Sequence, residues 1–192
     1  MLILLRHGQT AANAQSLLQG RIDLSLDEVG VEQARKCGEY LRATYKDLVV
    51  ISSPLIRAQQ TAGAVSDSVE IDERFIELDY GDWDGVALAD VDQQQWAQWR
   101  NDPSFRPPNG ETLLELDARV QPALHELMEV AKKHTVVVVS HVSPIKSGVA
   151  WAMGVGPETS WRMHLERASI CRIAIGPRGP ALHTFNDTSH LS

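Results

Sequence analysis

The sequence predicts an α/β fold, a three-layer sandwich in which helices flank a largely parallel central sheet. Short, wholly apolar runs are typical of strands buried on both faces. Segments with apolar residues at helical spacing follow these runs, and such alternation of strands and helices builds a parallel sheet. The chain of 192 residues has the length of one domain with a sizeable core. We therefore expect a single domain over residues 1–192.

The first strand is predicted over Met1–Leu5, a run of five apolar residues. It ends at Arg6-His7-Gly8, where a permanent cation and a titratable imidazole stand next to each other. In open α/β sheets, ligands bind beyond the carboxyl ends of the strands, so this end is a candidate site. A polar turn after an edge strand is the alternative. Residues 11–19 then form a loop or a helical turn.

A helix is predicted over residues 27–45, with an aspartate suited to be its N-cap. The next strand, Leu48–Ile51, leads to Ser53, which suits an N-cap, and to Pro54, which suits the first helical position. Arg57 then falls in the first turn of a helix, where the helix dipole disfavours a cation. A bound anion explains this position, and so does a salt bridge to an acidic side chain.

Residues 69–110 are rich in loops and are predicted to form a lid-like insertion over the carboxyl edge of the sheet. A third strand is expected within 69–76, a loop with two glycines begins at Glu77, and a helix is predicted over 88–100. Three tryptophans of this segment either line a pocket for an apolar leaving group or pack in the core: Trp83, Trp96 and Trp99.

The remaining chain continues the same alternation. A long helix is predicted over 113–131, and Pro122 inside it is expected to kink or divide it. Residues 135–139 form the most strongly β-branched run, which predicts a central strand. Ser143 and Pro144 suit the start of a helix that runs to about residue 153. Two last strands, over 169–175 and 181–185, are expected to form an edge pair.

Two of the predicted strands each lead into a histidine, His7 and His141. Neighbouring strands lie about 4.8 Å apart, so the two imidazoles meet over one sheet edge if these strands are adjacent. Arg6 and Arg57 follow strand ends as well. Two guanidinium groups and two imidazoles suit a compact anion such as a phosphoryl group, with about −1.5 to −2 charges and three strong acceptors.

Other ways of handling phosphate do not fit the sequence. It has no glycine-rich nucleotide-binding loop ending in Gly-Lys-Ser/Thr. It also has no cysteine separated from an arginine by five residues, as in the cysteine phosphatases, because Cys37 and Arg42 are one residue too close. Metal ligation by His7 and His141 is disfavoured because the arginines repel a cation. The remaining chemistry is a histidine nucleophile that forms a phosphohistidine. Glu77 is the candidate proton donor for the leaving oxygen, and a solvated loop carboxylate is the alternative reading.

These residues resemble the signature of the histidine phosphatase superfamily, which includes the cofactor-dependent phosphoglycerate mutases. The similarity runs in order from Met1 to about Gly154. The matching segments are Arg6-His7-Gly8, Asn13, Gln19–Asp23, Leu26–Gly30, Gln33-Ala34, Ser53–Ala62, Glu77–Gly85, Gly110-Glu111-Thr112 and Val139-Ser140-His141.

The resemblance implies the family's chemistry and requires no metal or organic cofactor. Where many members have a small residue after the second histidine, this chain has Val142, whose backbone N–H remains a candidate phosphate contact. The implied roles are His7 as nucleophile, Glu77 as proton donor, Arg6, Arg57 and His141 as phosphoryl ligands, and Asn13 and Gln19 as phosphate or substrate contacts.

Within this family, the sequence favours a phosphomonoester hydrolase over a phosphoglycerate mutase. The insertion is short, and its arginines, Arg100 and Arg106, stand among acids, so a second phosphate lacks a cationic site. The compact length and tryptophan-rich lid also resemble the ribazole-phosphate phosphatases of cobalamin assembly. A phospholigand-binding protein without activity is the alternative from another class. It is disfavoured because neither His7 nor Glu77 is missing.

The amino-acid composition excludes some classes of binding partner. The net charge of −7 and the pI near 5.4 argue against nucleic acid and anionic membranes. Two cysteines without metal-ligand spacing suit a reducing compartment, so we expect a cytoplasmic protein. We see no signal peptide and no apolar run near the roughly 20 residues of a membrane span. The expected partner is a small phosphorylated metabolite, and the chain is expected to be a monomer or a homodimer.

Overall fold

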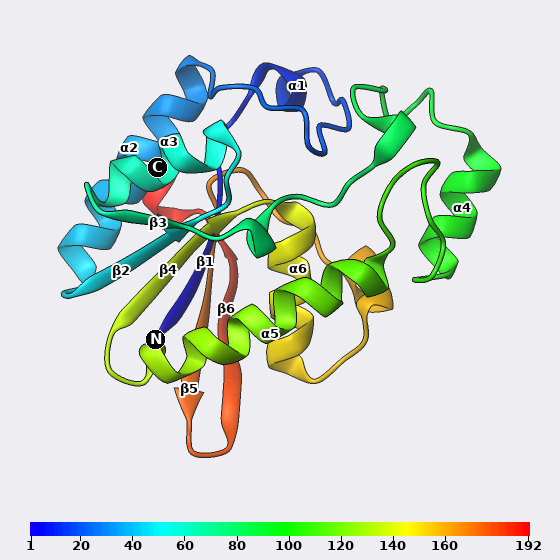
Figure 1. Cartoon of the computed structure of the whole chain (residues 1–192). Helices are drawn as coiled ribbons and strands as arrows, with labels where there is room; N and C mark the ends of the chain where they lie inside the picture. Colours follow the sequence, from blue (N-terminus) through cyan, green and yellow to red (C-terminus); the bar gives the residue numbers. More distant parts are fainter.

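The computed structural model describes residues 1–192 as one six-stranded sheet with helices on both faces (Figure 1). Its order is β3-β2-β4-β1-β5-β6, with the first four strands parallel and the last two antiparallel. The strands are β1 (Leu2–Arg6), β2 (Leu48–Ser52), β3 (Val69–Ile71), β4 (Thr135–Ser140), β5 (Ile170–Gly176) and β6 (Gly179–Asp187). The helices are α1 (Ala11–Ala14), α2 (Glu28–Thr44), α3 (Ile56–Val65), α4 (Gln93–Asn101), α5 (Leu113–Ala131) and α6 (Val142–Met153).

Alternate residues of β1 divide the core into two layers. Ile3 and Leu5 belong to a buried cluster with residues of α2 and α3 on one face of the sheet. Leu2 and Leu4 belong to a larger cluster with residues of α5 and α6 on the other face. Successive strand residues point to opposite faces, so a strand covered on both sides must be apolar throughout. The predicted three-layer α/β sandwich is confirmed.

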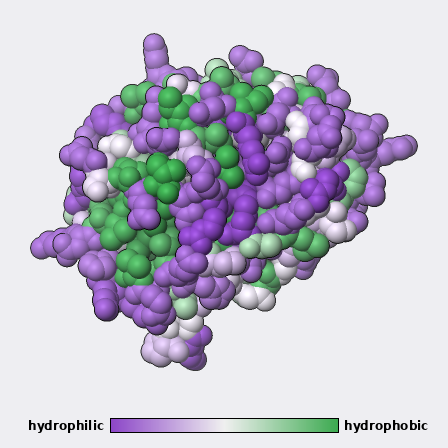
Figure 2. Space-filling model, viewed as in Figure 1, coloured by the Kyte–Doolittle hydropathy of each residue, from purple (hydrophilic) through white to green (hydrophobic).

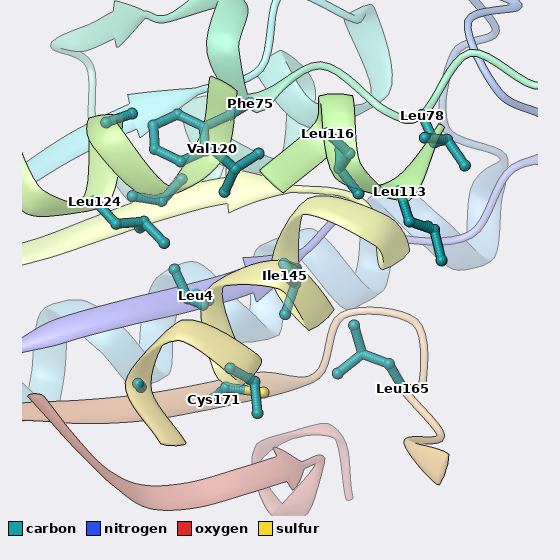
Figure 3. Close-up of a cluster of buried hydrophobic side chains, with 14 of the residues drawn as sticks. Leu4, Phe75, Leu78, Leu113, Leu116, Val120, Leu124, Ile145, Leu165 and Cys171 are labelled. Atoms are coloured by element: carbon teal, nitrogen blue, oxygen red, sulfur yellow. The ribbon is translucent and has the colours of Figure 1, made fainter. Parts of the chain in front are cut away.

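The larger cluster continues beyond the sheet towards the carboxyl ends of the strands. Leu116 and Val120 of α5, Ile145 of α6 and Leu4 of β1 meet there, and Leu78 of the predicted lid extends the same cluster (Figure 3). The lid segment is thus fixed by apolar burial to the helices that cover the sheet.

The two histidine-bearing strands are neighbours. β1 and β4 pair in parallel, with Leu5 opposite Val139 and Arg6 opposite Ser140. The residues that follow, His7 and His141, therefore leave the sheet side by side at its carboxyl edge. This adjacency, which the sequence could only pose as a condition, is confirmed.

Two predicted helix starts are wrong. α3 begins at Ile56, so Pro54 lies before the helix, and Ser53 does not cap it. The Ile56 N–H instead donates to the Asp23 carboxylate at 2.7 Å. In α6, His141 is the N-cap residue and Ser143 lies within the first turn, where its N–H donates to Glu77 at 3.2 Å. In both helices a carboxylate from a distant loop accepts an N–H of the first turn, and the serine expected as N-cap does not cap the helix.

Three further differences concern the predicted lid and the helix after it. The third strand is only Val69–Ile71, and it pairs with β2 as part of the sheet. α4 starts later than predicted, at Gln93, because the Asp92 carboxylate accepts two N–H groups of its first turn. α5 does not divide at Pro122. Its buried face packs on the sheet, and tertiary packing outweighs the cost of about 3 kcal/mol for an interior proline.

Figure 2 shows a mainly hydrophilic face with separate apolar patches. None of the helices combines the length and the hydropathy that crossing a membrane requires.

Candidate active site

A pocket of about 310 Å³ opens at the carboxyl edge of the sheet. Its polar part is formed by side chains that follow β1 and β2 and by the lid, and includes Arg6, His7, Arg57 and Glu77. Its opposite wall is apolar, with leucines and Trp96, Trp99 and Trp161. The pocket thus combines a charged floor with an aromatic wall.

His7 is held as a neutral imidazole whose one lone pair, on Nε2, accepts the Arg57 Nε–H at 3.3 Å. The side chain is 3% exposed, and Nδ1 lies 2.6 Å from the Gly8 carbonyl oxygen. A carbonyl only accepts, so Nδ1 carries the proton and Nε2 carries the lone pair. Burial, followed by the charges of Arg57 and Arg6, lowers the pKa of His7 well below its ordinary value. Nε2 therefore has the form of a nucleophile.

His141 has the opposite arrangement of its two nitrogens. Its Nε2 lies 2.7 Å from the Ser53 hydroxyl oxygen, which already accepts the Leu55 N–H at 3.3 Å. The serine hydroxyl proton can donate to His141 Nε2, and in that arrangement the ring proton sits on Nδ1. That Nδ1 is buried and has no partner. The two histidine rings lie 5.1 Å apart between centroids, so His141 stands beside His7.

The two arginines flank the nucleophile and are themselves anchored. Arg57 is 1% exposed, donates to the Gly20 and Ile22 carbonyls at 2.7 and 2.8 Å, and places its Nε 3.3 Å from His7 Nε2. Arg6 donates from Nη1 to the Leu165 carbonyl at 2.6 Å. No acidic side chain forms an ion pair with either one. Of the two explanations for a cation in the first turn of α3, the structure does not contain the salt bridge, and Arg57 donates to two backbone carbonyls instead.

Two residues that line the pocket have a buried donor without a hydrogen-bond partner, Arg6 Nε and Gln19 Nε2. His141 does not line the pocket, but its ring lies beside that of His7, and its buried Nδ1 has no partner either. Buried polar groups are satisfied in the great majority of cases, so a cluster of unsatisfied donors marks a ligand site. The Arg6 and Gln19 atoms carry hydrogens, so each can donate to an acceptor atom in the pocket. His7 also lines the pocket, and its Nε2 accepts from Arg57 Nε.

Glu77 lies at the rim of this donor cluster. The side chain is 5% exposed, and its Oε1 accepts the Leu78 N–H at 2.8 Å and the Ser143 N–H at 3.2 Å. The solvated-loop reading is therefore wrong. Two backbone donors fix one oxygen of the carboxyl group, which leaves the other oxygen available at the pocket.

The remaining predicted contacts also reach the pocket. Asn13, Gln19 and Val142 all line it. Asn13 is partly engaged, because its side chain forms a capping box with Thr10 at the start of α1. Val142 is the first residue of α6, where backbone N–H groups have no acceptor within the helix. Arg167 was missed by sequence reading, and it supports this loop by donating to the Asn13 carbonyl at 3.0 Å.

The tryptophans divide between pocket and core. Trp96 and Trp99 line the pocket, whereas Trp83 is buried behind them and packs on both. Trp161 was not expected, and it packs edge-on against Trp99 at 4.6 Å between ring centroids. Sequence reading also missed Lys146, which lines the pocket from α6. An isolated tryptophan or lysine outside a motif gives no sequence signal for a site.

No group of three or more histidine, cysteine, aspartate or glutamate side chains is arranged as a metal site.

A model of the histidine phosphatase superfamily, branch 1, matches residues 2–188. The chain belongs to the histidine phosphatase superfamily. The resemblance stated from the sequence motifs is confirmed, and the match extends past residue 154 to the antiparallel strands at the sheet edge.

Individual proteins that are similar to this chain support the family match. The bifunctional protein Rv2228c of Mycobacterium tuberculosis is 36% identical over 88% of this chain and 48% of its own length. The chain thus spans about half the length of several curated relatives that it matches. Phosphoserine phosphatase 1 of Hydrogenobacter thermophilus is 30% identical over 99% of this chain and 93% of the relative. A phosphoserine phosphatase mutant of Entamoeba histolytica, solved with phosphoserine, has a TM-score of 0.90 at 25% identity, covering 100% of this chain and 98% of that chain.

Proposed function

We propose that this protein is a phosphatase that hydrolyses a small phosphomonoester through a phosphohistidine on His7, without a metal or organic cofactor. The observation that carries the proposal is a neutral, buried His7 whose Nε2 lone pair accepts from the cation Arg57, in a pocket whose residues Arg6 and Gln19 have buried donors without a partner. A phosphoryl group supplies the acceptors that these donors lack, and phosphorus is the electrophile that the lone pair requires. The named activities of relatives, phosphoserine phosphatases among them, support the same reaction.

In the first step, His7 Nε2 attacks phosphorus and the bond from phosphorus to the ester oxygen breaks. Glu77 donates a proton to that oxygen, so the alcohol leaves neutral. Arg6, Arg57 and the His141 Nδ1–H stabilise the charge on the other phosphoryl oxygens. The Gly8 carbonyl holds His7 in one tautomer, so the ring needs no proton shift before attack. The Arg57 Nε–H, which donates to His7 Nε2 in this structure, turns to a phosphoryl oxygen as the lone pair attacks.

In the second step, water attacks the phosphohistidine. Glu77, now ionised, takes a proton from that water, and the bond from phosphorus to His7 Nε2 breaks. Inorganic phosphate leaves, and both His7 and Glu77 return to their starting states. The same carboxyl group thus serves as acid and then as base.

The positions of the lid arginines favour hydrolysis over mutase transfer. Arg106 pairs with Glu115, and Arg100 lies over the Trp161 ring at 5.9 Å. Neither lines the pocket. A bisphosphate intermediate would need a second cluster of cations, and the pocket provides only Lys146 beyond the two arginines of the floor.

The proposal is tested with p-nitrophenyl phosphate in the presence of a chelator, from about pH 5 to pH 8, a range that brackets the ordinary histidine pKa. We expect release of p-nitrophenol by the wild type and by His134→Ala, an exposed histidine far from the pocket, and none by His7→Ala. Turnover that survives His7→Ala would contradict the phosphohistidine step. If the wild type is inactive, 3-phosphoglycerate with its bisphosphate tests the mutase, and phosphate binding without turnover would indicate a phospholigand-binding protein.

A panel of phosphomonoesters then ranks the substrates. O-phosphoserine, 3-phosphoglycerate and ribazole phosphate represent the classes that the sequence and the relatives suggest. The preferred ester is the one with the highest kcat/KM, because that ratio measures discrimination between substrates.

A further inference from the structure

Lys146 is a cation without a counter-ion in the wall of the pocket. It lines the pocket from α6 and is only partly exposed. No carboxylate forms an ion pair with its ammonium group, and no hydrogen bond in the structure involves that group. Burial lowers the pKa of Lys146, and the charge of Arg6 lowers it further, whereas Glu77 acts in the other direction. A lysine held this way costs stability unless an anion compensates it.

When the phosphoryl group is bound, the positive charge of Lys146 has no compensating negative charge on the protein. A phosphoryl group brings about −1.5 to −2 charges, which Arg6 and Arg57 together neutralise. Glu77 is the acid that lines the same pocket, but in the attacking complex it carries the proton for the leaving oxygen. Nothing on the protein then offsets the ammonium charge, so the compensating anion has to come with the substrate.

The position of Lys146 places that anion on the leaving alcohol. Val142 and Ser143 begin α6 beside the phosphoryl floor, and Lys146 lies three residues after Ser143, on the same helix face and about 4.5 Å further along the axis. Trp99 and Trp161 stand in the same pocket as its apolar wall. The alcohol therefore meets a cation on α6 and aromatic rings opposite.

We propose that Lys146 is a specificity-determining residue that pairs with a carboxylate on the alcohol part of the substrate. The inference rests on the proposed phosphatase function and adds the substrate class: a phosphomonoester whose alcohol carries one acid group beside an apolar or aromatic part. The ester oxygen binds near Glu77, the carboxylate near Lys146, and the apolar part against the tryptophans.

A matched pair of esters isolates the charge. 4-Carboxyphenyl phosphate and 4-carbamoylphenyl phosphate have nearly the same shape and differ in one negative charge. We expect the wild type to prefer the carboxylate in kcat/KM, and Lys146→Met to lower the ratio of the two values by about tenfold or more, the size of one charge-assisted hydrogen bond. Lys133→Met, an exposed lysine outside the pocket, should keep the wild-type ratio.

The outcomes separate this inference from the proposed function. One outcome is that the wild type hydrolyses both esters while Lys146→Met leaves the ratio of the two kcat/KM values unchanged. Lys146 then does not bind a carboxylate of the substrate, although the phosphatase proposal stands. A uniform loss on both esters places the ammonium on the phosphoryl group and also overturns the inference. If the wild type hydrolyses neither ester nor any other phosphomonoester, both proposals fail. Should Lys146→Met not fold, Lys146→Gln provides the same charge removal with a polar side chain.

Discussion

The chemistry of the pocket depends on which nitrogen of each histidine carries the proton. The Gly8 carbonyl sets this for His7 and the Ser53 hydroxyl sets it for His141, each through one short contact. The two rings lie side by side, yet one offers a lone pair and the other an N–H. Sequence motifs identify both histidines but not their tautomers, because the tautomer is decided by a neighbour in space.

Glu77→Gln tests the proton donor at the residue scale. Glutamine keeps an oxygen that can accept the Leu78 and Ser143 N–H groups, but it has no acidic proton. We expect hydrolysis of an alkyl phosphate such as O-phosphoserine to fall by about 100- to 10,000-fold. p-Nitrophenyl phosphate should lose much less in the first step, because p-nitrophenolate leaves without a proton.

The measurement is a pair of single-turnover rates for the two esters in wild type and variant. Equal losses for the alkyl and the nitrophenyl ester would rule out Glu77 as the acid for the leaving group. His7→Ala, which removes the nucleophile, provides the control in which both rates vanish.

At the scale of elements, the strands follow from the sequence, whereas the starts of α3, α4 and α6 do not. The β-branched run of β4 and the apolar run of β1 can only be satisfied by burial on both faces, so their identity is local information. The starts of α3 and α6 depend on Asp23 and Glu77, whose carboxylates arrive from distant loops. These two misplaced helix starts thus lie at the site, where the two loops converge.

The lid carries a pH-sensitive contact at Asp84. Burial raises the pKa of Asp84 to about 6, and its Oδ2 accepts the Arg21 N–H at 3.0 Å. Because the folded-state pKa lies above the unfolded value, the folded state binds more protons between about pH 4 and pH 6, and this group destabilises the fold as pH rises through that window. Gly20 packs against the same carboxylate, where a Cβ would lie 1.7 Å from Asp84 Oδ1.

Asp84→Asn should therefore stabilise the protein at neutral pH and not at pH 4. Asparagine keeps the acceptor for Arg21 and removes the buried charge. Asp84 is half-buried and solvent screens part of the shift, so we expect a gain of about 1 kcal/mol at pH 7, or roughly 2–4 °C in Tm. Thermal melts of both proteins across this range check the prediction, and a Tm difference that does not change with pH would contradict it.

For the whole molecule, the site is held in place by the same apolar packing that forms the core. The apolar cluster between the sheet and α5 continues into the lid through Leu78, one residue after Glu77 (Figure 3). This packing offsets the free energy that it costs to bury two histidines and two arginines at the sheet edge. The sequence predicts this fold because apolar patterning is repeated in every strand. It does not predict Lys146 or Trp161, because their role arises only where α6 and the segment after it meet the pocket.

Two buried neutral histidines should make the whole fold sensitive to acid. Burial lowers the pKa of His7 and of His141 well below the ordinary value, with the charge of Arg57 as the next cause. The unfolded chain then binds more protons below about pH 6.5, so this stability is complete above that pH and is lost as pH falls. Each histidine contributes a slope of at most about 1.4 kcal/mol per pH unit.

Urea unfolding at pH values between about 7.5 and 5.5 measures this slope. We expect stability to fall towards acid in the wild type and to fall less steeply in His7→Asn, which has one histidine fewer to protonate. An identical pH dependence in the two proteins would show that His7 is not held neutral by the fold.

The central claim is that His7 becomes covalently phosphorylated during turnover. The direct measurement is rapid quenching of the wild type with a phosphomonoester substrate in chelator, followed by mass spectrometry of the peptide that contains His7. The account predicts an acid-labile, base-stable phosphoryl group on His7 that forms and decays at the rate of turnover and is absent in His7→Ala. A phosphoryl group on another residue, or turnover in His7→Ala, would contradict it.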